Sequence, residues 1–164
     1  MKKNNEVSNF LGALEFAARA NILFISFPFE FQKFSKEDLQ YLSDNRLIKQ
    51  FINDNGEAEF IFHVYAVKFL LGNMKSKIQP PPATIDINRV FGPLEAAFRW
   101  NISLSKLLDS LNPNIKREEH KKAELDAVIK QGLVKIYSVR FRKEYIIHEN
   151  AMRFLFGKEK DKEL

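Results

Sequence analysis

Cysteine is absent from the 164-residue sequence, and glycine occurs only six times. The absence of cysteine excludes a disulfide framework, a thiolate zinc site and a cysteine nucleophile. Six glycines are few for loops that cradle phosphates, and the sequence contains no Walker loop, zinc-ligand pair or nucleophile elbow. We therefore expect a protein that is not an enzyme and that uses neither a cofactor nor a metal ion.

Long hydrophobic runs are also missing. The longest, Ile22 to Phe29, falls well short of the ~20 residues that cross a bilayer, and the polar N-terminal stretch lacks the apolar core of a signal peptide. The composition nevertheless supplies a packed core, because 45% of the residues are hydrophobic and sixteen of them are Phe. We expect a globular, intracellular (cytoplasmic) protein with no membrane partner.

Positive charge is concentrated in the second half of the sequence. Residues 81–164 hold sixteen Lys and Arg against twelve Asp and Glu, whereas residues 1–80 hold ten against nine. This excess is compatible with a polyanionic partner but does not require one, since net charge bears on solubility and encounter before it bears on a site.

The sequence repeats itself. LEFAARANI at 14–22 returns as LEAAFRWNI at 94–102, FHVYAVKFLLG at 62–72 matches IHENAMRFLFG at 147–157, and IKQ at 48–50 recurs at 129–131. Three matches in the same order predict a duplicated unit of about 65 residues.

A proline-rich stretch separates the two copies. Residues 73–88, NMKSKIQPPPATIDIN, contain three consecutive prolines, which favour an extended spacer. We therefore expect two domains, a first repeat over 8–72 and a second repeat over 89–158, joined by a linker over 73–88.

The second repeat predicts three helices, a β-hairpin and a last helix. The first helix begins at Pro93, the second is capped by Ser105 or a residue near it, and the third covers about 116–131 and ends at Gly132. LVKIYSV and EYIIH form the hairpin, and Asn150 caps the last helix.

The first repeat ends in the same way, with a helix opened by Ser35, a hairpin and a last helix. Asn55-Gly56 predicts a type I′ turn in this hairpin. The second repeat has four more residues between Gln131 and His148 than the first has between Gln50 and His63, which predicts a longer hairpin there.

The stretch ISLSKLLDSL…ELDAVIKQGLVKIY resembles the winged-helix superfamily in its second helix, third helix, Gly-Leu-Val step and first wing strand. The resemblance covers nearly all of the second repeat and reaches the first through the duplication, although ILFISFPFEFQKF departs from the pattern. It implies an α+β fold, mainly α, of tandem helix-helix-helix-β-hairpin-helix repeats. Winged helices mostly bind DNA with helix three and the wing, and a large minority serve as protein–protein modules.

Several paired polar residues have a structural explanation. An acid four residues before an arginine is the favourable order for a helix ion pair, Asn can end a helix in the left-handed conformation, and a neutral His can tie a strand end to the following helix. The residues concerned are Glu15–Arg19, Glu95–Arg99, Asn21, Asn101, His63 and His148.

Candidate DNA contacts lie on the third helix and the wing of the second repeat. If Leu125, Val128 and Ile129 face the core, cations lie on the opposite face of the helix. In VRFRKEY, an extended strand places Arg140 and Arg142 on one face, opposite Val139 and Phe141. The predicted DNA-binding residues are Lys116, His120, Lys130, Arg140, Arg142 and Lys143.

These signals have alternatives. Glu119, Glu124 and Asp126 flank the third helix and repel phosphate, and a basic hairpin can also be an edge protected by charge against aggregation.

The first repeat has a different character. Its hairpin is acidic, with Asp54, Glu57 and Glu59, so a nucleic-acid face there is not expected. Its phenylalanines form either an internal strand or core, or a partner and dimer surface. These residues are Phe27, Phe29, Phe31 and Phe34.

Two functions follow from these features. The first is a DNA-binding protein, either a transcriptional regulator or a replication or architectural factor, that contacts double-stranded DNA with its second repeat and uses the first for homodimerisation or docking on a protein. The second is a non-enzymatic protein–protein interaction or scaffold module.

Overall fold

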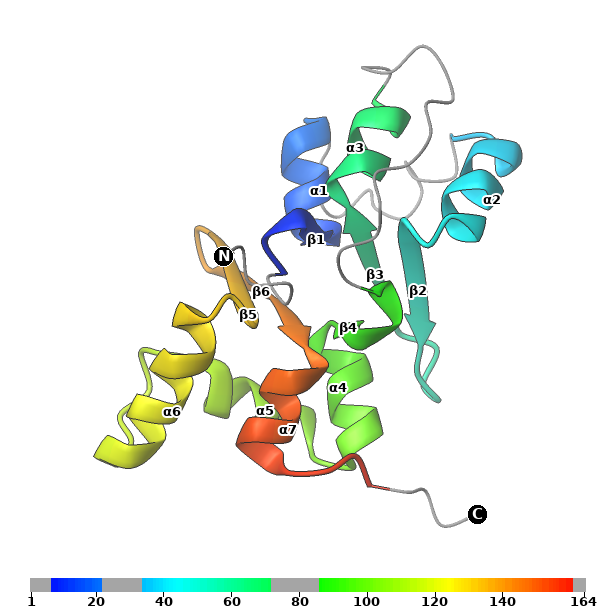
Figure 1. Cartoon of the computed structure of the whole chain (residues 1–164). Helices are drawn as coiled ribbons and strands as arrows, with labels where there is room; N and C mark the ends of the chain where they lie inside the picture. Colours follow the sequence, from blue (N-terminus) through cyan, green and yellow to red (C-terminus); the bar gives the residue numbers. More distant parts are fainter. Residues whose placement is uncertain (1–6, 22–33, 72–85, 161–164) are drawn as a thin grey trace.

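The computed structural model describes residues 7–21, 34–71 and 86–160. These ranges contain seven α-helices, two short 3-10 helices and two antiparallel three-stranded sheets (Figure 1). The α+β class expected from the sequence is confirmed.

The first repeat forms one sheet with strand order β1-β3-β2. Its elements are a 3-10 helix at Val7–Asn9, β1 at Phe10–Gly12, α1 at Ala13–Ala20, α2 at Lys36–Asp44, β2 at Ile48–Ile52, β3 at Ala58–His63 and α3 at Val64–Leu70. Residues 22–33, where the sequence departs from the predicted repeat pattern, lie outside the described ranges.

The second repeat forms the other sheet, with the equivalent order β4-β6-β5. Its elements are a 3-10 helix at Ile87–Arg89, β4 at Val90–Phe91, α4 at Pro93–Trp100, α5 at Leu104–Leu111, α6 at Glu119–Lys130, β5 at Val134–Val139, β6 at Arg142–His148 and α7 at Glu149–Phe156. Three helices, a hairpin and a last helix follow one another as predicted. The short strand before the first helix, present in both repeats, was not predicted.

Side-chain caps start the helices at positions that differ in part from the predicted ones. Ser35 caps α2 as expected, because its Oγ accepts the Asp38 N–H at 3.1 Å. Ser103, two residues from Ser105 and within the predicted cap region, caps α5 through the Lys106 N–H. The last helix of the second repeat is capped by His148 rather than Asn150, because the His148 side chain accepts the Asn150 N–H.

The left-handed helix ends are confirmed. Asn21 and Asn101 end α1 and α4 with φ of 55° and 51°, and Gly132 has φ of 73° just after α6. In the first repeat Arg46, with φ of 57°, occupies the position equivalent to Gly132.

The register of the hairpins corrects the predicted equivalence of the two IKQ stretches. The His63 N–H donates to Leu47 O and the His148 N–H donates to Leu133 O, each at 2.8 Å. Lys49 is therefore equivalent to Lys135, and residues 129–131 belong to the end of α6 and the position after it.

The hairpin turns were also predicted wrongly. The first repeat has a loop over 53–57 in which Gly56 has positive φ and Asn55 does not, so the type I′ turn is not formed. Its Asn53 side chain accepts the N–H groups of Asn55 and Glu57. The second hairpin has only two turn residues, because Val139 pairs with Arg142. The predicted longer hairpin is also wrong, because 14 residues separate Leu133 from His148 whereas 15 separate Leu47 from His63; only the strands of the second hairpin are longer.

The repeats pack on each other through a shared hydrophobic cluster. Buried side chains of both sheets and both 3-10 helices form it: Val7, Phe10, Ile61, Ile87, Val90 and Ile146. Further clusters lie within each repeat, around Trp100 in the second and around Phe16 and Leu42 in the first. Ile87, in the predicted linker 73–88, is only 3% exposed, so the folded part of the second repeat begins by Asp86.

Because the cluster joins both repeats, we expect the protein to unfold in one cooperative transition. Ile87→Ala should lower the free energy of unfolding by about 2 to 5 kcal/mol. Trp100, the only tryptophan, reports the second repeat by fluorescence, and circular dichroism reports both. The two probes should give coincident urea transitions. Ile52→Ala, at a side chain that is 58% exposed, is the matched control and should change stability little.

Candidate functional site

Each repeat supplies a carboxylate to the first helix of the other. Glu144 on β6 accepts the Leu14 N–H at 2.7 Å and the Glu15 N–H at 3.2 Å, at the start of α1. Glu59 on β3 does the same at the start of α4, accepting from Leu94 at 2.8 Å and Glu95 at 3.2 Å. Two of the free N–H groups of each helix are thus satisfied by the opposite repeat.

The residues before these two helices are glycines for a steric reason. Gly12 and Gly92 occupy the N-cap positions and carry no capping side chain. A Cβ atom at Gly12 would overlap the Glu144 carboxylate, and one at Gly92 would overlap the Glu59 carboxylate. Glycine therefore makes room for a cap that arrives from the other repeat.

Two ion pairs cross between the repeats in the same reciprocal way. Lys49 Nζ lies 2.9 Å from Glu95 Oε2 and donates to Val90 O. Lys135 Nζ lies 2.7 Å from Glu15 Oε1 and donates to Phe10 O at 2.9 Å. The two sets of contacts are related as in an isologous dimer interface, although both halves belong to one chain.

The predicted helix ion pairs form, and they join this network. Arg19 Nη2 lies 2.8 Å from Glu15 Oε2, and Arg99 Nη1 lies 3.8 Å from Glu95 Oε1. Arg99 lies closer to Glu159, at 2.9 Å. Glu15 is buried rather than at the surface, so these pairs contribute to the junction between the repeats.

Burial changes the protonation of the junction. It raises the pKa of Glu59 to about 7, against the effect of the N–H groups of Leu94 and Glu95, and it raises the pKa of Glu144 in the same way. Burial lowers the pKa of Lys49, which Glu95 opposes. Burial also lowers the pKa values of His63 and His148, which suits a neutral ring whose Nδ1 accepts a backbone N–H.

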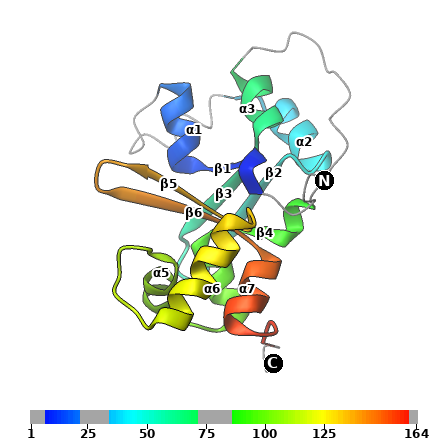
Figure 2. The ribbon, with the colours of Figure 1, turned by 60° about the vertical axis from the view of Figure 1, so that its left-hand side comes forward.

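The basic tip of the second hairpin, residues 139–143, projects into solvent. Arg140, Arg142 and Lys143 are all exposed there. Arg140 and Phe141 are the two turn residues, so the strand alternation predicted through them does not hold. Figure 2 shows the β5–β6 hairpin extending past the second repeat toward α1.

One contact places the basic tip beside the loop between α5 and α6. Lys143 Nζ donates to Asn112 Oδ1 at 3.1 Å. Lys116 is exposed in this same loop, before α6 rather than on it, and His120 follows in the first turn with its Nδ1 3.5 Å from Glu118 Oε2. Lys130 is separate from them, because it ends α6.

Helix α6 presents its polar side outward. Leu125 and Val128 are buried against α7 and β5, as predicted, and Ala123 is exposed on the outer side. Figure 1 shows α6 at the periphery of the second repeat.

Of the four phenylalanines predicted as core or partner surface, only Phe34 falls in the described ranges; Phe27, Phe29 and Phe31 lie outside them. Phe34 is half-buried and packs edge-on against Phe16, with ring centroids 6.3 Å apart. This contact favours the internal alternative for Phe34.

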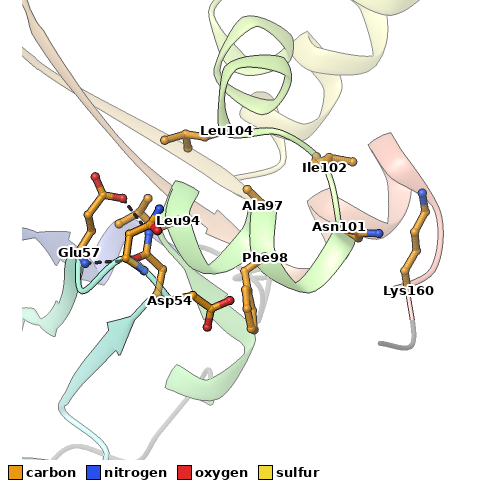
Figure 3. A pocket seen from close by; sticks show the side chains of 11 residues that line it. Asp54, Glu57, Leu94, Ala97, Phe98, Asn101, Ile102, Leu104 and Lys160 are labelled. Atoms are coloured by element: carbon orange, nitrogen blue, oxygen red, sulfur yellow. Dashed lines mark hydrogen bonds between the residues drawn. The ribbon is translucent and has the colours of Figure 1, made fainter. Parts of the chain in front are cut away.

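A cleft of about 1090 Å³ lies between the first hairpin loop and α4. Figure 3 shows Asp54 and Glu57 at one end of it and Lys160 at the other, around Leu94 and Phe98. The lining mixes solvated charges with apolar side chains and brings no acid–base pair together.

No protein-family model, curated protein or solved structure matches this chain. Across residues 7–21, 34–71 and 86–160, no helix is long and apolar enough to cross a membrane, and no three His, Asp or Glu side chains group as a metal site.

The reciprocal caps, which the sequence does not predict, make the free energy of unfolding depend on pH. With a folded pKa of about 7 against an ordinary 4.5, folded Glu59 keeps a proton that the unfolded chain releases between these pH values. The free energy of unfolding should therefore fall as pH rises through this window, by about 3 kcal/mol. Glu59→Gln should remove this part of the slope in urea titrations at pH 5 and pH 8. Asp54→Asn, at an exposed loop carboxylate, should leave it unchanged.

Proposed function

We propose that the protein binds double-stranded DNA through α6 and the β5–β6 hairpin of its second repeat. The observation that carries the proposal is the charge of the corresponding segments in the two repeats. Residues 116–143 hold nine Lys and Arg against four Asp and Glu, whereas residues 34–57 hold three against five. The two corresponding segments therefore carry net charges of opposite sign, +5 in the second repeat and −2 in the first.

The shape of the second repeat fits this partner. Twelve residues make α6 about 18 Å long, and a helix fits the major groove of B-DNA. The exposed Ala123 allows close approach on its outer side. Glu119 and Asp126 on the same helix are exposed and repel phosphate, so the basic tip and Lys116 make the main backbone contacts.

The resemblance to tandem winged helices supports the same assignment, with α6 as helix three and the β5–β6 hairpin as the wing. The first repeat then serves for homodimerisation or docking on a protein partner, and the whole acts as a transcriptional regulator or as a replication or architectural factor.

A scaffold function is the second candidate, and the first hairpin is the observation that favours it. Ile52 is 58% exposed at the end of β2, next to the acidic loop 53–57. An apolar side chain beside a charged rim is typical of a protein-binding surface.

Charge reversal of the basic tip tests the DNA assignment. Replacing Arg140, Arg142 and Lys143 with Glu should reduce the affinity for a mixed-sequence duplex at least tenfold at low salt and lower the salt slope by about 0.9 per lost phosphate contact. Fluorescence anisotropy measures both quantities, and circular dichroism checks that the fold persists.

A matched control makes the same change in net charge elsewhere. Lys36, Lys68 and Lys158 are exposed and lie outside the basic tip and α6, and replacing them with Glu should reduce affinity far less. Equal losses of affinity in both triple variants would show that net charge alone causes the effect, and would contradict a specific role for the basic tip. A wild-type protein that binds no duplex at low salt would leave the scaffold function in its place.

A further inference from the structure

Phe141 lies fully in water at the end of the second hairpin. Its relative exposure is 103%, in contrast to the buried Phe10, Phe16, Phe62 and Phe91. An exposed aromatic ring of this size forgoes a large burial energy, and an isolated one at a hairpin tip is available to a partner.

The turn that carries Phe141 departs from ordinary turn chemistry. Two-residue hairpin turns prefer Gly, Asn or Asp, whereas this one is Arg140-Phe141 with Arg140 at φ of 53°. A bulky residue in the left-handed region is strained. Local rules broken together in this way are expected where a site is functional.

The hairpin holds the ring on a stiff support. The β5–β6 ladder runs without interruption to the pair Val139–Arg142, directly behind the turn. Tyr145 is buried in the second-repeat core and Glu144 is fixed at the start of α1, so only the pairs Ser138–Lys143 and Val139–Arg142 extend beyond the anchored part.

Three cations flank Phe141 along the chain. Arg140 and Arg142 are its chain neighbours and Lys143 follows, all three exposed. Nucleic acid can bind the cations and the Phe141 ring at the same time, because its phosphates attract the cations and the flat face of a base stacks on the ring. A membrane surface suits the tip less well, because interfacial binding uses several apolar side chains and Val139, at 37% exposure, is the only other one in the tip.

We propose that Phe141 is a base-stacking wedge, which inserts between bases of the bound DNA while the surrounding cations hold the backbone. This inference rests on the proposed function. Apolar side chains that enter a base step unstack it and kink the duplex, and the step opens more easily where pairing is already broken. The protein should therefore prefer a duplex with an internal mismatch to the same duplex fully paired.

The test compares two 20-base-pair duplexes of mixed sequence, one fully paired and one with a central mismatch, as probes for the full-length protein. Wild type should bind the mismatched duplex at least tenfold more tightly. Phe141→Ala should abolish this preference and keep the salt slope of binding to the paired duplex. Val139→Ala is the control, because it removes the neighbouring apolar side chain without touching the ring.

Phe141→Trp supplies a direct readout of stacking. The fluorescence of the new indole should be quenched when the variant binds the mismatched duplex. Wild type, whose only indole is the buried Trp100, should show no such quenching. Equal preference in wild type and Phe141→Ala overturns the wedge while leaving DNA binding in place, whereas a wild type that binds neither duplex overturns both. A blue shift of the indole on phosphatidylserine vesicles without quenching by DNA would overturn it in favour of a lipid partner.

Discussion

The exchange of carboxylates between the repeats is the constraint on which the rest of the structure depends. Each first helix begins without a capping side chain of its own and takes its cap from a strand of the other repeat. The residue before each first helix must then be glycine, and each hairpin must cross the junction to reach the helix of the other repeat. A lysine on the adjacent strand of each hairpin forms an ion pair with a glutamate of that same helix: Lys49 with Glu95, and Lys135 with Glu15. The shared hydrophobic cluster joins the same two sheets that supply these polar contacts.

This symmetric junction ends where the hairpins leave it. As far as Glu59 and Glu144, β3 and β6 make the same kinds of contact at equivalent positions. Beyond them one hairpin closes in an acidic loop against α4, and the other continues as a regular ladder to a two-residue basic turn. The interior is thus common to both repeats, and the chemistry that distinguishes them lies at the tips.

Local signals in the sequence missed the His148 cap and both hairpin turns. They did predict one helix cap and the left-handed helix ends, because these features depend on neighbouring residues. Ser35, Asn21, Asn101 and Gly132 are examples. The junction could not be predicted from local signals, because the partners of Glu59 are 35 and 36 residues away and those of Glu144 are 129 and 130 residues away. A signal is present in the sequence, since each glutamate lies four residues before a histidine and each first helix follows a glycine, but these local features do not show which helix each glutamate caps. The two IKQ stretches match by chance, so aligning them pairs Lys49 with Lys130 instead of with its structural equivalent, Lys135. The DNA-binding assignment of the exposed cations stays a prediction.

One consequence concerns the covalent joining of the repeats. A homodimer built on this junction would place identical hairpins at its two ends, so any substitution at one tip would appear at the other. With both halves in one chain, the complementary contacts form intramolecularly at high effective concentration. A substitution at one hairpin tip then leaves the other tip unchanged. One can lose its positive charge and the other can gain a bare aromatic ring while the junction that orients both stays the same.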